Sequence, residues 1–335
     1  MIGLTRSITA IGTATATATS PPQEPTMVAS THHLVTHDGL DLHVTTYGRE
    51  DADVAVVLAH CWTADEEDWH YQVHDLLAAY GDRLRIVTWD HRGHGRSQAA
   101  PERACTIENL AVDMGDIIDT FAPHGRLVLA GHSIGGMTMT ALPQVRPELV
   151  DRVAGLLFVS TSAGELDTVT LGLPEVGPLL RARIPAVLAL RARLYSRANR
   201  RRTPSIERQV VNRFLFGTPL RLRDAGLVVD QIINCPPATM SGFYRDFMTH
   251  ERASVLKAYD GVPTRVLVGT RDLLTPPHHG RRLAASIDGA RFLTVPGAGH
   301  MLPLERDELV SAQLMELVEE AAATTSPAPQ APLTA

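Results

Sequence analysis

The sequence has few cysteines and no long apolar run, and its acidic residues outnumber its basic ones. Cys61, Cys105 and Cys235 are too few and too scattered for a disulfide framework or a CxxC metal site. No apolar run approaches the ~20 residues that a transmembrane helix needs. The 31 basic residues against 37 acidic ones give a net charge of −6, which argues against a generic nucleic-acid binder. We therefore expect no metal, no membrane span and no nucleic-acid partner.

Both ends of the chain are rich in Thr, Ala, Ser and Pro. Residues 1–26 contain a polar TATATAT stretch and one early positive charge, Arg6, whereas a secretory signal needs a basic region and an apolar core. We interpret residues 1–30 and 324–335 as disordered tails. Met27 is an alternative start, and the cytoplasm is the expected location.

Apolar strand-like runs alternate with amphipathic helical stretches over residues 31–162 and 251–323. Asp38-Gly39 separates the two strands of an opening hairpin. Further strands are expected at residues 54–60, 85–90, 126–131, 153–160, 264–269 and 291–295. Helices are expected at residues 65–80, 106–121, 278–287 and 303–323, the second with Asp113 and Asp116 on its polar face. This alternation predicts an α/β fold, with a mostly parallel sheet covered by helices on both faces.

The alternation stops between residues 163 and 250, which we interpret as a helical insertion in a single α/β domain. Residues 181–202 of this segment contain eight Arg and no Asp or Glu. Leu188, Leu190, Leu194 and Tyr195 interleave with the arginines. A solvated helix face is the favoured interpretation. Two alternatives stay open. One is recognition of lipid head groups, phosphopantetheine carriers or acyl-CoA, and the other is a weak contact with a membrane surface.

The motif that carries chemistry is Gly131-His132-Ser133-Ile134-Gly135, a G-x-S-x-G between an expected strand and an expected helix. Glycines allow a sharp strand-to-helix turn that exposes the serine hydroxyl above a helix N-terminus. A serine hydroxyl is a weak nucleophile, so it needs a base and a group that orients the base. The motif therefore predicts a nucleophile at Ser133.

Asp272 and His300 are the candidates for the orienting acid and the base. Asp272 comes just after an expected strand, and His300 lies in a glycine-rich loop after the next one. The carboxyl ends of neighbouring parallel strands line one edge of a sheet, so both side chains are expected near Ser133. A helix N-cap for Asp272 and a packed loop histidine for His300 are the alternatives.

The order Ser133, Asp272, His300, with DHRGHGRS at residues 90–97, resembles the α/β-hydrolase superfamily over residues 31–322. The resemblance implies a helical cap over the serine, no cofactor and no metal, and a structural role for DHRGHGRS. It also implies an oxyanion hole formed by the backbone N–H groups of Trp62 and Ile134. Cys61 stands where the family usually has glycine, and cysteine tolerates a positive φ poorly. We expect Cys61 to be a small buried side chain rather than a nucleophile.

The resemblance implies a carboxylesterase- or lipase-like serine hydrolase that forms an acyl-enzyme on Ser133. Its substrate would be a small, apolar carboxylic ester, thioester or related acyl compound. Cofactor-free haloperoxidases, C–C bond hydrolases and acyltransferases use the same apparatus, and a non-catalytic ligand-binding protein is a third alternative. The acyl chain, the leaving group and the oligomeric state are left open.

Overall fold

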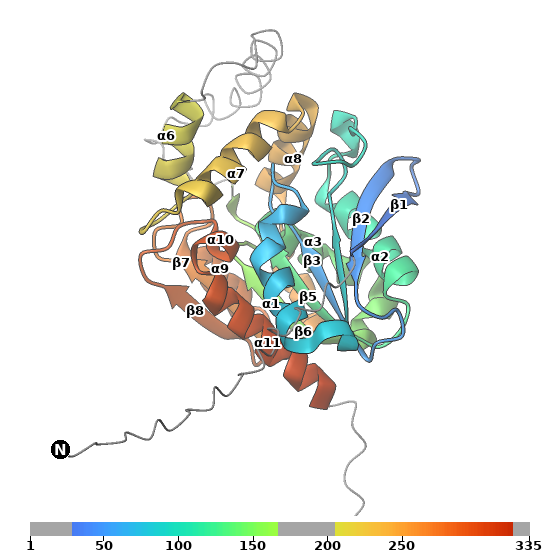
Figure 1. Cartoon of the computed structure of the whole chain (residues 1–335). Coiled ribbons are helices and arrows are strands. Elements are labelled where there is room, and N and C mark those ends of the chain that lie inside the picture. The colour runs from blue at the N-terminus through green and yellow to red at the C-terminus, as the bar shows by residue number, and fades with distance from the viewer. Residues whose placement is uncertain (1–28, 167–204, 324–335) are drawn as a thin grey trace, which may run out of the picture.

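The computed structural model describes residues 29–166 and 205–323, and an eight-stranded sheet forms its centre (Figure 1). The strand order is β1-β2-β4-β3-β5-β6-β7-β8. The hairpin strands β1 and β2 are antiparallel, β2 is antiparallel to β4, and all other pairs are parallel. The strands are β1 (Ser30–Val35), β2 (Asp41–Tyr47), β3 (Val54–Ala59), β4 (Leu84–Trp89), β5 (Arg126–His132), β6 (Val153–Val159), β7 (Thr264–Gly269) and β8 (Arg291–Val295).

Helices cover both faces of the sheet. Helices α1 (His70–Tyr80) and α11 (Asp307–Ala323) pack on one face, and α2 (Ile107–Phe121), α3 (Ile134–Val145) and α9 (Pro277–Ala285) pack on the other. The side chains of a strand alternate between the faces. In β3 the even-numbered residues 54, 56 and 58 join the core under α1 and α11, and the odd-numbered ones join the core under α2, α3 and α9. The predicted α/β fold is therefore confirmed.

Two of the expected helices are not continuous α-helices over their predicted ranges. The helix expected at residues 65–80 opens as a 3₁₀ turn, η1 (Glu66–Trp69), which Asp65 caps by accepting a hydrogen bond from Glu67 N. The last helix is interrupted at Arg306, between α10 (Leu302–Glu305) and α11. Short turns of this kind are common at helix ends.

Asp113 is buried, so the prediction that it lies on the polar face of its helix is wrong. Its side chain is 1 % exposed and forms an ion pair with Arg92, whose side chain is fully buried. Two hydrogen bonds of 2.7 Å join them, and Arg92 also binds Asp38. A buried charge is tolerated when it is paired and hydrogen-bonded. The pair ties the loop at residues 90–97, expected to be structural, to α2.

Helices fill the described part of the segment between β6 and β7. These helices are α6 (Ser205–Phe214), α7 (Leu222–Asn234) and α8 (Pro237–Thr249), and Figure 1 shows them above the sheet. An antiparallel bridge between Gly164 and Glu251 closes the base of the segment. These two residues lie at the boundaries expected for the insertion at 163–250. The Arg-rich residues 181–202 and both expected tails, apart from residues 29–30, lie outside the described residues.

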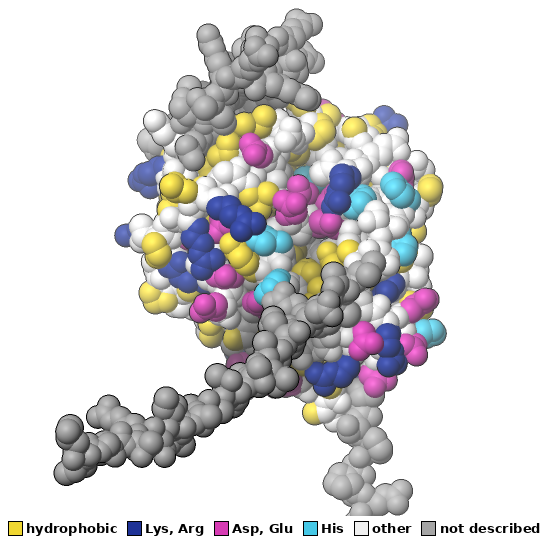
Figure 2. All heavy atoms as spheres, viewed as in Figure 1, with side chains coloured by type: hydrophobic (Ala, Val, Ile, Leu, Met, Phe, Trp, Pro, Cys, Tyr) yellow, Lys and Arg dark blue, Asp and Glu magenta, His cyan; other side chains and the backbone are white. Residues whose placement is uncertain are grey.

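Basic and acidic side chains alternate over the face shown in Figure 2. Three large hydrophobic residues among those described are strongly exposed: Val35, Leu222 and Ile233. Two of them lie on α7. No helix within residues 29–166 and 205–323 is long and apolar enough to cross a membrane.

Candidate active site

Ser133 occupies a strained turn between β5 and α3. Its φ of 52° and ψ of −114° lie in a region that non-glycine residues rarely adopt. The turn depends on its two glycines: a Cβ at Gly131 would lie 2.5 Å from the backbone of Gly135, and one at Gly135 would lie 2.1 Å from the carbonyl oxygen of Ala59. The sequence therefore folds here into the sharp elbow that the motif predicts.

Hydrogen bonds to the neighbouring strand hold this elbow. The N–H of Ser133 donates to the carbonyl of Val159 at 2.9 Å, and the hydroxyl of Thr161 donates to the carbonyl of Ser133 at 2.6 Å. The Ser133 residue is 8 % exposed. The strained backbone is thus fixed by β6 and by Thr161, two residues beyond the end of β6.

Asp272 and His300 form a buried pair at the same edge of the sheet. Nδ1 of His300 lies 2.9 Å from Oδ2 of Asp272, and the side chains are 3 % and 0 % exposed. Oδ1 of Asp272 accepts the N–H groups of Leu274 and Thr275, and the Thr275 hydroxyl donates to Oδ2. Burial acts to raise the pKa of Asp272, but the charge and hydrogen bond of His300 and the Thr275 bonds together lower it. Asp272 is therefore held as a carboxylate.

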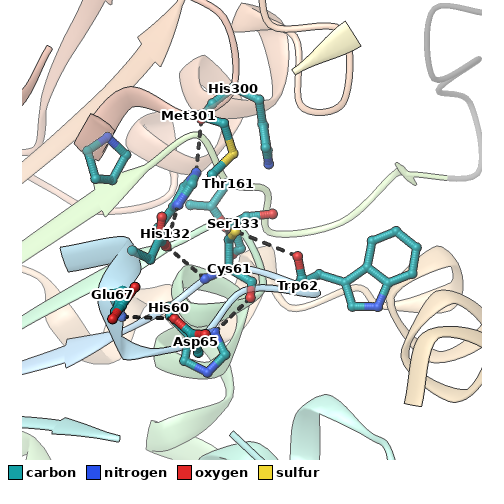
Figure 3. A network of polar contacts seen from close by, with 12 residues as sticks. His60, Cys61, Trp62, Asp65, Glu67, His132, Ser133, Thr161, His300 and Met301 are labelled. Carbon is teal, nitrogen blue, oxygen red and sulfur yellow. Dashed lines mark hydrogen bonds and ion pairs between the residues drawn. The ribbon is translucent and has the colours of Figure 1, made fainter. Parts of the chain in front are cut away.

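The ring of His300 is turned toward Ser133 in Figure 3. Among the hydrogen bonds of residues 29–166 and 205–323, none joins the Ser133 hydroxyl to His300. A contact between nucleophile and base is often long before substrate binds, so the missing hydrogen bond does not exclude His300 as the base. The structure thus brings Ser133, Asp272 and His300 together from three separate loops.

Trp62 and Ile134 contribute the two backbone N–H groups expected to face the reacting oxygen. No hydrogen bond within the described residues uses either N–H group. Trp62 lies in the loop after β3, and Ile134 begins α3 directly after the serine. Unpaired N–H groups at such positions suit an anion that develops during a reaction.

The loop after β3 accommodates Cys61 without a positive φ. The left-handed residue of this loop is Thr63, with φ 67°, and Cys61 lies outside that region. Cys61 is 5 % exposed, as expected for a small buried side chain. Burial and the nearby Asp68 carboxylate raise the pKa of its thiol well above the ordinary value. The thiol form is therefore favoured over the reactive thiolate.

Sequence reasoning missed Glu305, which holds the loop that carries His300. Its carboxylate accepts the N–H groups of Gly299 at 3.0 Å, Met301 at 3.1 Å and Gly217 at 2.7 Å. The N–H of His300 itself donates to the carbonyl of Leu215. Leu215 and Gly217 follow α6, so the inserted segment and the His300 loop are joined directly.

Sequence reasoning also missed Asp68 and His132, which form a second buried pair behind Ser133. His132 Nδ1 lies 2.7 Å from Oδ2 of Asp68. A polar residue inside the apolar strand β5 was the available signal for His132. The sequence offered no comparable signal for Asp68, because the pairing joins positions 64 residues apart.

Apolar side chains surround the residues just described. One cluster contains Ile134 and Trp62, and another contains Cys61 and Met301, the neighbour of His300. In the first cluster the Trp62 ring contacts those of Phe247 and Tyr244 on α8, with centroids 5.2 and 6.3 Å away. The surroundings therefore suit an apolar group bound between the sheet edge and the inserted helices.

This chain is similar to a known protein family and to several proteins and solved structures. The family described as "Alpha/beta hydrolase family" matches residues 56–313. BpoC of Mycobacterium tuberculosis, named after non-heme bromoperoxidases, is 27% identical over 74% of this chain and 87% of its own. An acetyltransferase component of the Pseudomonas putida acetoin cleaving system is 26% identical over 79% of this chain and 63% of its own. A solved esterase of Thermogutta terrifontis, with malate bound, has 25% identity and a TM-score of 0.68 over 87% of this chain and 99% of its own.

Proposed function

The chain belongs to the alpha/beta hydrolase family, and on that premise we propose that it is a serine hydrolase that cleaves a carboxylic ester or a related acyl bond. The observation that carries the proposal is the strained Ser133 elbow between two unpaired N–H groups, beside the buried Asp272–His300 pair. The likeness to the Thermogutta esterase, at 25% identity, supports an ester substrate. The apolar clusters around the site support a small apolar acyl group.

In the proposed reaction Ser133 Oγ attacks the acyl carbon while its proton passes to Nε2 of His300. The carbonyl oxygen becomes negative and accepts hydrogen bonds from the N–H groups of Trp62 and Ile134, each worth about 3 to 4 kcal/mol of transition-state stabilisation. His300 then protonates the leaving alcohol, and the acyl group remains on Ser133. Asp272 stays ionised throughout and stabilises the imidazolium.

Water completes the cycle by the same route in reverse. His300 takes a proton from water, the hydroxide oxygen attacks the acyl carbon, and the carboxylic acid leaves as Ser133 recovers its proton. The residues 163–250 act in this proposal as a cap that limits water entry and shapes the acyl pocket. No cofactor or metal takes part in any step.

Replacing Ser133 by alanine tests the proposal. Ser133→Ala is expected to reduce kcat for p-nitrophenyl acetate by about 10⁶-fold, because removal of the nucleophile leaves only the oxyanion hole and binding. Ser160→Ala is a matched control, since Ser160 is also buried, has a positive φ of 45° and directly follows the neighbouring strand β6. Near-normal turnover by Ser133→Ala would contradict the proposal.

Perhydrolysis is the second candidate, favoured by the likeness to BpoC. The same acyl-enzyme would then be released by hydrogen peroxide, which yields a peracid in place of the acid. Adding peroxide to the esterase assay separates the two: a peracid product that exceeds the acid product would make hydrolysis the minor activity. Acyl transfer is distinguished from hydrolysis in the same way: an alcohol or thiol is added as acceptor, and the acylated acceptor is compared with the acid product.

A further inference from the structure

A second histidine–carboxylate pair lies directly behind the proposed catalytic one. The side chains of His132 and Asp68 are both 0 % exposed, and His132 Nδ1 lies 2.7 Å from Asp68 Oδ2. His132 is the residue before Ser133, and Asp68 belongs to η1, which follows the oxyanion loop. The ring centroids of His132 and His300 are 5.2 Å apart (Figure 3).

This pair joins three loops of the site through hydrogen bonds. Nε2 of His132 lies 2.9 Å from the backbone carbonyl of His300, and Oδ2 of Asp68 accepts the N–H of Cys61 at 3.0 Å. Cys61 directly precedes Trp62, one of the two unpaired N–H donors. The serine elbow, the oxyanion loop and the His300 loop are therefore held to one another by two buried side chains.

The geometry also defines where the protons lie. A backbone carbonyl can only accept a hydrogen bond, so Nε2 of His132 carries a proton. The contact of 2.7 Å between Nδ1 and Oδ2 of Asp68 places a second proton between these two groups. Burial acts to lower the pKa of His132, but the carboxylate of Asp68 and the hydrogen bonds to Asp68 and His300 raise it above its ordinary value. These contacts describe a buried imidazolium.

Asp68 is not the only titratable group near the His132 ring within the described residues. The others are Cys61, His60, His300 and Asp272. The thiol of Cys61 stays protonated, and burial lowers the pKa of His60 well below its ordinary value, so both are neutral. The positive charge of His132 is thus set among the carboxylates of Asp68 and Asp272.

Cys61, Asp68 and His132 each offer a metal-ligand atom, and these atoms lie within 4.8 Å of one another. The donors are already engaged with protein partners, since Asp68 Oδ2 binds both His132 Nδ1 and Cys61 N. The Cys61 thiol is directed to the carbonyl of Trp62 at 3.6 Å. Hydrogen bonds therefore join these side chains, and Oδ1 of Asp68 has no hydrogen-bond partner within the described residues.

We propose that Asp68 and His132 are positioning residues, which align the Trp62 N–H and the His300 backbone for the transition state. This inference rests on the proposed function, in which Ser133 is the nucleophile. They touch neither the substrate nor the reacting atoms. Alignment errors of about 1 Å cost on the order of 10²-fold in rate. Loss of alignment lowers kcat more than it changes KM, because the aligned groups act on the transition state.

Asp68→Asn is the variant that tests this role. Both contacts of Asp68 use Oδ2, and an amide oxygen placed there carries no negative charge with which to hold an imidazolium. We expect kcat for p-nitrophenyl acetate to fall about 10- to 100-fold, with KM changed by less than about threefold. Asp113→Asn is the matched control, because Asp113 is an equally buried, ion-paired carboxylate bound to Arg92. It should lower the unfolding midpoint and leave kcat unchanged.

Histidine ¹⁵N NMR of the full chain provides a readout that a merely structural role would not move. In the wild type we expect one imidazolium signal, with both ring nitrogens protonated, that persists to a higher pH than the signals of histidines with an ordinary pKa. The signal should vanish in His132→Gln and should titrate in Asp68→Asn. This spectrum decides the charge of the pair even if Asp68→Asn does not fold.

The outcomes separate this inference from the proposed function. A neutral His132 in the wild type, or an Asp68→Asn variant with wild-type kcat and KM, would overturn the positioning role. A wild type that neither hydrolyses esters nor is labelled at Ser133 by a fluorophosphonate would instead overturn the proposed function, and the NMR result would still stand on its own.

Discussion

Asp272–His300 and Asp68–His132 are two buried histidine–carboxylate pairs with contacts of 2.9 and 2.7 Å, and their rings lie side by side. They differ at the other ring nitrogen. Nε2 of His132 donates to a carbonyl, whereas Nε2 of His300 forms no hydrogen bond within the described residues. A pair with a free nitrogen can carry a proton to and from a substrate. A pair with both nitrogens engaged can only hold charge and geometry.

Between the two pairs, the larger loss of activity should come from removing the acid of the first pair. Asp272→Asn should reduce kcat about 10⁴-fold, because an amide neither stabilises the imidazolium nor holds the ring in the required tautomer. Steady-state kinetics on p-nitrophenyl acetate measure it. The matched Asp68→Asn change should cost at least a hundredfold less. Equal losses in the two variants would remove the distinction between a proton-carrying and a positioning pair.

Glu305→Gln tests whether the support of the His300 loop is separable from both pairs. The amide keeps one acceptor oxygen and turns an N–H₂ group toward backbone N–H groups, so buried donors lose their partners. We expect the free energy of unfolding to fall by about 1 to 3 kcal/mol, measured by urea denaturation. Glu308→Gln, an exposed change three residues later, should stay within about 0.5 kcal/mol of the wild type. Equal stability of both variants would contradict the role given to Glu305.

The last prediction concerns the pH dependence of stability that arises from buried histidines without a carboxylate partner. Burial lowers the pKa values of His94, His250 and His279 to about 4, from an ordinary 6.5. The unfolded chain therefore binds these protons first, and the stability they contribute is complete above pH 6.5 and is lost as the pH falls toward 4. Each group can cost up to about 1.4 kcal/mol per pH unit in that window.

His132 should behave in the opposite way, since its pKa is raised. Its contribution is complete below pH 6.5 and is lost only as the pH rises through the folded-state pKa.

Urea denaturation of His279→Gln from about pH 4 to about pH 7 checks the sign of the pH dependence predicted for the histidines with a lowered pKa. This variant should lose less stability on acidification than the wild type does. A steeper loss would contradict the neutral state assigned to His279.

The sheet and the three residues Ser133, Asp272 and His300 could be predicted from the sequence, because each follows a local pattern. Strands β7 and β8 match their expected ranges, and glycines mark the elbow. A strand pattern or a strand-to-helix turn is written in adjacent residues, so no distant contact is needed to recognise it.

The supporting residues could not be predicted, since their partners are distant in sequence. Asp113 has the spacing of a polar-face residue, and only the buried Arg92 explains its position. Asp68 and Glu305 gain their importance from backbone N–H groups of other loops, which no side-chain pattern reveals. Loop contacts of this kind become visible only when the fold is known.

The most direct measurement of the central assignment is intact-protein mass spectrometry of the wild type during turnover of a p-nitrophenyl ester, followed by peptide mapping. We predict a mass increase of one acyl group, located on the peptide that contains Ser133 and absent in Ser133→Ala. An ester that is turned over while the acyl group is found on another residue, or on none, would contradict it.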